Sequence, residues 1–276
     1  MCIRDSLGIE VKGSKRWLDL IFLPRFQPVE IVKPFFIVSL SLMLTIQNRK
    51  LYFKYFLSSL LILPILMLLI YQPDIGQTLL ISMVWLALIF VSGINIFIFF
   101  IFFLFVGLSV SYLILFVPKF EYIKIRLFAF LDSSSSNNYQ AEKASDAIIN
   151  GGFFGKGIGE GTLNSRVPEA HTDYIVSVIS EEFGAIIVIG ILFLYLIFSY
   201  RVMRKINFAK EELSKLILSG CISLILIQTF IHVGVNIRIL PTTGMTLPFL
   251  SYGGSSIVST AILSGLILNL TKRKLD

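Results

Sequence analysis

Charged side chains are scarce in this 276-residue chain. Asp, Glu, Lys and Arg make up 15% of the residues, whereas a soluble domain carries about 25%. Hydrophobic residues make up 55%, and the mean hydropathy is +0.83. This balance excludes an ordinary soluble domain and predicts a polytopic membrane protein.

Cysteine is nearly absent, and so are several familiar motifs. Cys2 and Cys221 lie far apart, and Cys221 falls in an apolar run, so neither a disulfide framework nor a metal–thiolate site is indicated. The chain has no internal repeat, no nucleotide-binding glycine loop and no cleavable signal peptide. Residues 1–6 match neither a membrane segment nor a targeting signal.

Long apolar runs are abundant, and a helix needs about 20 such residues to cross a bilayer. We predict an all-α fold, a transmembrane helical bundle forming one membrane domain over 1–276. The apolar stretch 77–117 is interpreted as two spans, the third and the fourth, because about 40 residues are too many for a single span. The seven predicted spans lie near 30–46, 54–71, 77–93, 95–117, 175–199, 216–237 and 255–270.

The basic loops predict the orientation. Three connecting segments are rich in Lys and Arg: residues 48–54, the loop 200–215 and the tail 272–274. With seven spans they fall on the same side of the membrane, which the positive-inside rule makes cytoplasmic. The long loop 118–174 and the loop 241–254 then lie outside. The outer side is also basic, which favours a polyanionic ligand, although snorkelling to lipid phosphates accounts for roughly half of these cations.

Short polar segments precede the first and third predicted spans. Glu30 and Lys33 are three apart, so they can pair on one helix face or simply support the helix entry. Arg16 beside Trp17 offers a forked phosphate donor and an interfacial aromatic anchor. Asp74 follows a proline, and capping of the next helix is the favoured interpretation of its carboxylate.

Two glycine-rich segments interrupt the later part of the chain. Residues 150–159 either bring backbone N–H groups close to an anion or act as a hinge, with Lys156 among them. Residues 240–256 contain two prolines and three glycines, so they cannot continue a helix. A re-entrant loop and an ordinary surface loop are both compatible with that pattern.

The densest cluster of ionisable groups is Glu169, His171 and Asp173, directly before an apolar run. Desolvation of a carboxylate there increases its basicity, which suits Asp173 to proton abstraction. Glu169 and His171 could instead bind a metal, but one His at alternate positions is a weak ligand signature. A carboxylate at a membrane boundary is a functional candidate.

Taken in order, these segments resemble the SEDS family, named for shape, elongation, division and sporulation. The chain is more similar to the division branch, typified by FtsW, than to the elongation branch, typified by RodA. Two positions depart from the family pattern: Val29 stands where Ser is usual, and His232 where Asn is common, and we expect His232 to be a hydrogen-bonded helix residue. The resemblance is carried by Arg16-Trp17, Gln27-Pro28 with Glu30 and Lys33, Gln72–Gly76, Tyr139-Gln140, Gly151–Gly157, Pro168–Asp173 and Leu247–Ser256.

The resemblance implies a ten-span fold, of which this chain would hold the last seven spans. It also implies a peptidoglycan glycosyltransferase that polymerises lipid II in septal wall synthesis. Asp173 would be the general base. Arg16, Lys33 and Lys156 would stabilise the leaving pyrophosphate, while Glu30, Asp74, Glu169 and His171 would support the site. No protein-built metal site is predicted, although a divalent cation such as Mg²⁺ is compatible with the chemistry.

The implied partners are lipid II, a class B penicillin-binding transpeptidase and other division membrane proteins, without nucleic acid. The implied location is the bacterial cytoplasmic membrane, with the active site facing the periplasm. Two other functions stay open: a lipid II flippase, and a noncatalytic scaffold that activates a division transpeptidase. A RodA-like role in elongation and cell shape is the alternative within the family.

Overall fold

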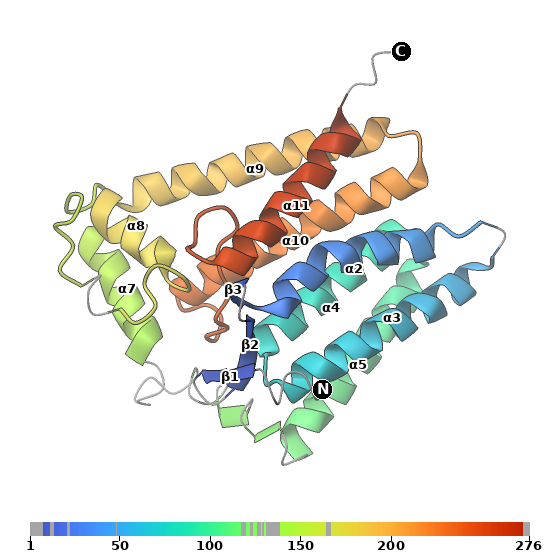
Figure 1. Ribbon diagram of the computed structural model, residues 1–276, viewed down its shortest axis with the longest axis horizontal. Coiled ribbons are helices and arrows are strands. Elements are labelled where there is room, and N and C mark those ends of the chain that lie inside the picture. Colours follow the sequence, from blue (N-terminus) through green and yellow to red (C-terminus); the bar gives the residue numbers. More distant parts are fainter. Residues whose placement is uncertain are drawn as a thin grey trace. The chain divides into compact units, whose positions relative to one another are not determined.

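The computed structural model describes residues 8–11, 14–20, 23–47, 49–116, 139–163 and 167–272, with isolated positions between 120 and 130. This part of the chain is mainly helical, as predicted (Figure 1). Its elements are β1 (Gly8–Val11), β2 (Ser14–Leu20), β3 (Leu23–Phe26), α2 (Pro28–Leu44), α3 (Leu51–Tyr71), α4 (Ile75–Val91), α5 (Ile96–Phe116), α7 (Tyr139–Gly151), α8 (Ile175–Phe183), α9 (Ala185–Phe208), α10 (Glu212–Asn236) and α11 (Gly254–Thr271).

The apolar runs form the long helices. Within the described residues, α3, α9, α10 and α11 are each long and apolar enough to cross a membrane, and α4 is an apolar helix of 17 residues. The chain is therefore a multi-pass membrane protein. Helices α2 and α5 match the first and fourth predicted spans. The total of seven spans stays a prediction.

The predicted span 175–199 is wrong at its beginning. Two helices occupy this region, because α8 ends at Phe183 and α9 starts at Ala185. Gly184 between them has φ 84° and ψ 169°, a conformation that is essentially restricted to glycine. The membrane-spanning helix is consequently α9, which extends to Phe208.

A small sheet precedes α2, and the sequence pattern did not predict it. Strands β1, β2 and β3 pair antiparallel in that order, with Ile9 opposite Trp17 and Leu18 opposite Phe26. Helix α2 then begins with Pro28. Proline suits a first helical position because it needs no hydrogen-bonded N–H there.

The chain divides into two compact units. Unit 1 comprises 1–92, 199–227 and 252–276, and unit 2 comprises 93–198 and 228–251. In unit 1, α2 packs against α3, α4 and α11. Gly220 of α10 makes room for the Ile37 side chain of α2, because a Cβ atom at this position would lie 2.6 Å from Ile37 Cγ2.

In unit 2, α7 packs against α8, and three glycines let the two backbones touch. A Cβ atom on Gly151 would lie 2.0 Å from the Ser180 carbonyl oxygen, and one on Gly184 would lie 2.1 Å from that of Phe153. A Cβ atom on Gly155 would likewise lie 2.2 Å from the Glu182 carbonyl oxygen. We call residues 151–157 and 180–186 the glycine joint.

Backbone hydrogen bonds fasten the glycine joint. The N–H groups of Lys156 and Gly157 donate to the carbonyl oxygens of Glu181 and Glu182, at 2.9 and 3.0 Å. In the other direction, Ala185 N donates to Gly152 O at 2.9 Å. The N–H groups of Lys156 and Gly157 are two of those predicted to approach an anion, and both are bonded to protein carbonyls instead.

Substitution Gly184→Ala tests the joint. We expect a loss of about 1–3 kcal/mol from the backbone conformation, increased by the clash with the Phe153 carbonyl. The measurement is thermal unfolding of the purified protein in detergent. Gly190→Ala is the matched control, because a Cβ atom there meets nothing within 4 Å. Equal unfolding temperatures for the two variants would contradict the claim that the close contact at Gly184 stabilises the protein.

Candidate functional site

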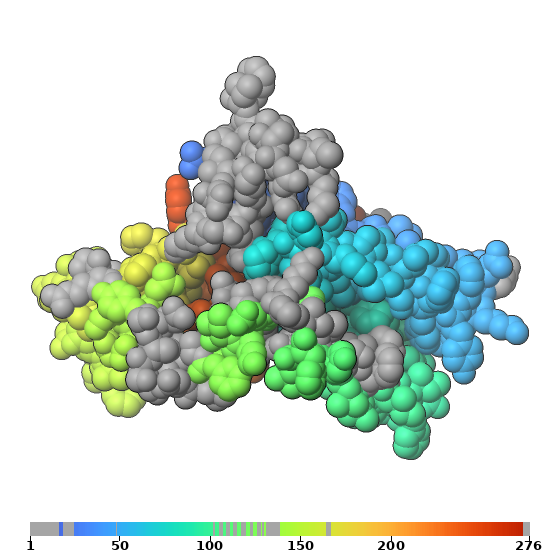
Figure 2. Space-filling view, turned by 90° about the horizontal axis from the view of Figure 1, so that it is seen from below, coloured from blue at the N-terminus to red at the C-terminus, as the bar shows by residue number. Residues whose placement is uncertain are grey.

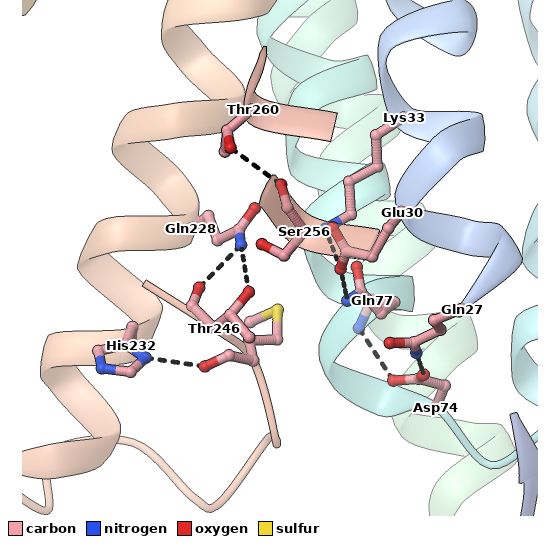
Figure 3. Close-up of polar contacts among 11 residues, drawn as sticks. Gln27, Glu30, Lys33, Asp74, Gln77, Gln228, His232, Thr246, Ser256 and Thr260 are labelled. Atoms are coloured by element: carbon pink, nitrogen blue, oxygen red, sulfur yellow. Dashed lines mark hydrogen bonds and ion pairs between the residues drawn. The ribbon is translucent and has the colours of Figure 1, made fainter. Parts of the chain in front are cut away.

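In unit 1, Glu30 and Lys33 form the predicted pair on α2. Lys33 Nζ donates to Glu30 Oε1 at 2.7 Å, and Gln77 Nε2 of α4 donates to the same oxygen at 2.8 Å (Figure 3). The Lys33 side chain is 0% exposed and that of Glu30 is 5% exposed. The pair is therefore enclosed by protein, where the cation neutralises a carboxylate that also links α2 to α4.

Asp74 caps α4, which confirms the favoured interpretation of its carboxylate. Its side chain accepts a hydrogen bond from Gln77 N at 3.3 Å and another from Gln27 Nε2 at 3.3 Å (Figure 3). Asp74 is buried. Gln77 consequently contacts two carboxylates, Asp74 through its backbone and Glu30 through its side chain.

In unit 2, Asp173 lies in a turn that leads directly into α8. The N–H groups of Thr172 and Asp173 both donate to the Glu169 carbonyl at 3.1 Å, and Glu169 opens this turn with φ 58°. The Asp173 side chain is partly exposed. A Cβ atom on Gly244 would lie 3.5 Å from Asp173 Oδ2, so the residue beside this carboxylate has no side chain to cover it.

One face of α10 supports the irregular backbone around Asp173. Gln228, His232 and Asn236 are four residues apart, so they share one side of the helix. Asn236 Nδ2 donates to the Asp173 carbonyl at 3.2 Å, while its Oδ1 accepts from Ser177 N at 3.3 Å. Asn236 thus holds Asp173 and the first turn of α8 together.

The other two side chains of this face bind the loop 241–251. Gln228 Nε2 donates to the Thr246 carbonyl at 2.8 Å, and His232 Nδ1 contacts the Met245 carbonyl at 2.7 Å (Figure 3). A carbonyl oxygen only accepts, so Nδ1 carries the proton. The expectation that His232 is a hydrogen-bonded helix residue is confirmed.

The loop 241–251 folds back against its own unit. Ser251 Oγ donates to the Thr172 carbonyl at 2.7 Å and accepts from Leu247 N at 2.8 Å. The Tyr195 hydroxyl of α9 donates to the Pro248 carbonyl. Met245 and Leu247 are buried. Protein groups therefore satisfy much of the backbone, as a re-entrant loop requires, and one of them anchors the residue before Asp173.

Tyr174 follows Asp173 and is buried. Burial raises the pKa of its phenol above the usual value, and the negative charges of Asp173 and Glu169 raise that pKa further. Both causes disfavour the phenolate, so Tyr174 stays protonated beside the two carboxylates.

The other predicted site residues lie in different elements. Lys156, Glu169 and His171 are exposed, in the glycine joint and in the turn before α8. Arg16 lies in β2, and its side chain is outside the described part of the structure. The roles assigned to these residues and to Lys33 stay predictions.

The sequence reasoning missed Glu181. This residue of α8 is fully buried, and its Oε1 accepts from Asn150 Nδ2 at 3.0 Å and from Leu163 N at 2.9 Å. A signal was present, because a carboxylate inside an apolar run is a functional or structural candidate by default. Asn236 and Ser251 were missed because their partners are backbone groups distant in the sequence.

Among the residues that the structure describes, no three His, Cys, Asp or Glu side chains gather closely enough to hold a metal ion. A divalent cation that acts with the substrate stays a prediction of the family resemblance.

The helices and the two polar clusters define a class of protein. It is a helical multi-pass membrane protein with a partly exposed carboxylate, Asp173, next to the folded-back loop 241–251. Within that class, the chain belongs to the cell cycle protein family of FtsW, RodA and SpoVE, whose family model matches residues 1–275. This is the SEDS family expected from the motifs.

Relatives of this chain are named for an activity. This chain is 33% identical over 281 residues to a probable peptidoglycan glycosyltransferase FtsW of Caulobacter vibrioides, and the match covers 97% of this chain and 68% of that protein. It is 35% identical to the protein of the same name from Trichlorobacter lovleyi, covering 96% and 71%. The FtsW-like subfamily expectation is thereby confirmed.

Solved structures share the fold. A chain of a peptidoglycan synthase complex, described for its coordination of polymerization and crosslinking, matches with a TM-score of 0.80 at 27% identity, covering 98% of this chain and 76% of that one. The rod shape determining protein RodA of Thermus thermophilus matches with a TM-score of 0.66 at 25% identity, covering 100% and 75%.

The buried pair gives a prediction for stability. Lys33→Met leaves the Glu30 carboxylate buried without its cation, so we expect a loss of about 3–5 kcal/mol. The double variant Glu30→Gln/Lys33→Met should recover part of it, because no unpaired charge remains. Thermal unfolding in detergent measures both.

The control is Lys143→Met, which breaks another i,i+3 pair. Lys143 Nζ lies 3.3 Å from Asp146 Oδ2, but these side chains are 30% and 44% exposed. Such a pair contributes about 0–1 kcal/mol. A Lys33→Met protein as stable as Lys143→Met would show that the buried pair contributes little.

Proposed function

We propose that this chain is a peptidoglycan glycosyltransferase that polymerises lipid II during septal wall synthesis. The observation that carries the proposal is the environment of Asp173. Its backbone is fixed by Asn236, and Ser251 fixes the preceding carbonyl, while its carboxylate is partly exposed beside Gly244. A general base needs this combination of fixed position and access to the proton it removes.

The proposed chemistry is one displacement at an anomeric carbon. Asp173 accepts the proton of the 4-hydroxyl of the acceptor N-acetylglucosamine. The resulting oxygen nucleophile bonds to the anomeric carbon of the donor N-acetylmuramic acid. The bond from that carbon to the pyrophosphate oxygen breaks, and undecaprenyl pyrophosphate leaves with the bonding electrons.

The cations have different access to such a substrate. Lys156 is exposed and is a candidate for stabilising charge on the leaving pyrophosphate, together with Arg16. Lys33 is enclosed and paired with Glu30, which favours an indirect role through the contact between α2 and α4. The same reasoning assigns Asp74 to structural support, because its carboxylate caps a helix.

Asp173→Asn tests the catalytic assignment. The substitution is nearly isosteric but removes the proton acceptor, so polymerisation should fall about 100- to 10,000-fold. The measurement is glycan polymer formed from lipid II by the purified intact protein in detergent. A flippase has no membrane to act across in this assay, and an inactive scaffold forms no polymer, so wild-type product also separates the proposal from both alternatives.

The matched control is Asp74→Asn. Asn caps helices about as well as Asp, so this variant should keep near-normal polymerisation and expression. Near-normal activity of a folded Asp173→Asn protein would remove Asp173 from the mechanism. An inactive but folded Asp74→Asn protein would move the base to Asp74.

The site is proposed to face the periplasm across the bacterial cytoplasmic membrane. The basic segments 48–54 and 200–215 support this orientation. With Cys2 replaced by Ser and Cys221 by Ala, single cysteines at Glu160 and Lys205, both exposed, should react oppositely with an impermeant thiol reagent added outside cells. We expect labelling at Glu160→Cys only. Labelling at Lys205→Cys only would invert the topology.

We further propose a class B penicillin-binding transpeptidase as partner. The fold shared with a chain of a peptidoglycan synthase complex supports this, because nascent glycan strands need crosslinking. We expect the intact protein to co-purify with a single-span transpeptidase of this class as a stable complex. Separate elution of the two proteins at high concentrations of both would count against the partnership.

A further inference from the structure

Three large apolar side chains are exposed in the glycine joint and directly after its first segment. Phe153, Phe154 and Ile158 are 71%, 84% and 78% exposed. They lie among glycines and charged residues, so they are not part of a membrane-spanning run. Helix α7 and the segment after it lie at the surface, in yellow-green (Figure 2). Apolar side chains gathered at a surface mark an interaction site.

Hydrogen bonds place these residues level with the start of a spanning helix. Ala185 N donates to Gly152 O at 2.9 Å, and Ile186 N donates to Phe153 O at 3.3 Å. Ala185 and Ile186 are the first residues of α9, which is long and apolar enough to cross the membrane. The first turn of such a helix lies near the bilayer surface, so the backbone of Phe153 lies there too.

The joint also prevents these side chains from withdrawing. Gly184 and Phe153 approach so closely that no side chain fits at Gly184, and Lys156 and Gly157 are bonded to the end of α8. The apolar surface also continues onto α9, where Ile186 and Ile189 are exposed. Exposed apolar side chains on a spanning helix suit contact with the hydrocarbon chains of lipid.

We propose that Phe153, Phe154 and Ile158 form a lipid-binding surface. They insert into the bilayer leaflet at the N-terminal end of α9 and extend the lipid-facing side of that helix. The occupant is the acyl-chain boundary of the leaflet, which accepts Phe and Ile side chains held at interfacial depth. The surface thereby fixes the height of the glycine joint, and of α8, relative to the membrane.

Site-directed spin labelling measures the depth directly. Nitroxides are attached to Phe154→Cys and, separately, Ile158→Cys in the intact protein, with Cys2→Ser and Cys221→Ala. The protein is reconstituted in vesicles of phosphatidylethanolamine and phosphatidylglycerol. Collision with oxygen, which concentrates in the bilayer, is compared with collision with a water-soluble nickel chelate. Glu160→Cys is the aqueous control in the same loop, and Ile189→Cys is the lipid control on α9.

We expect the oxygen-to-nickel collision ratio at 154 and 158 to be several-fold above that at 160 and close to that at 189. A ratio like that at 160 would place the surface in water and overturn the proposal. Protection from both reagents would instead indicate a protein contact and overturn it equally. Phe154→Trp provides a second measurement, since brominated lipids should quench its added fluorescence.

Discussion

Irregular backbone in a membrane protein needs a hydrogen-bond partner for each enclosed N–H and C=O group, and in unit 2 one face of α10 supplies several of them. Gln228, His232 and Asn236 bind carbonyls of Thr246, Met245 and Asp173. Leaving one such buried group unsatisfied costs about 1–3 kcal/mol. The loop 241–251 and the turn before α8 therefore depend on the same helix, and this dependence fixes the backbone of Asp173.

Burial then separates the roles of the carboxylates. Asp74, Glu30 and Glu181 are buried, and each accepts hydrogen bonds from side chains or backbone groups of the protein. Their charge is used to hold helices and turns together. Asp173 differs, because its main-chain carbonyl is bound by Asn236 while its side chain is partly exposed beside a glycine. The chemical proposal for Asp173 follows from this difference in access.

Local patterns predicted the local features well. The apolar runs predicted α2 to α5 and α10 to α11, the i,i+3 spacing predicted the Glu30–Lys33 pair, and the position of Asp74 after a proline predicted a cap. The break at Gly184 was missed because Ile175–Ile179 is as apolar as a span, and one glycine does not reveal its φ angle. The glycine joint and the partners of Asn236 depend on residues about 30 to 60 positions apart, which no local pattern reports.

Helix α8 connects these features mechanically. Its nine residues make it about 13 Å long. At its N-terminal end, Asn236 binds Ser177 N and the Asp173 carbonyl; at its C-terminal end, the glycine joint binds it to α7 and to the first turn of α9. A short helix held at both ends transmits position from one end to the other. Anything that sets the height of the joint relative to the membrane, including the proposed lipid-binding surface of Phe153, Phe154 and Ile158, therefore also sets the height of Asp173.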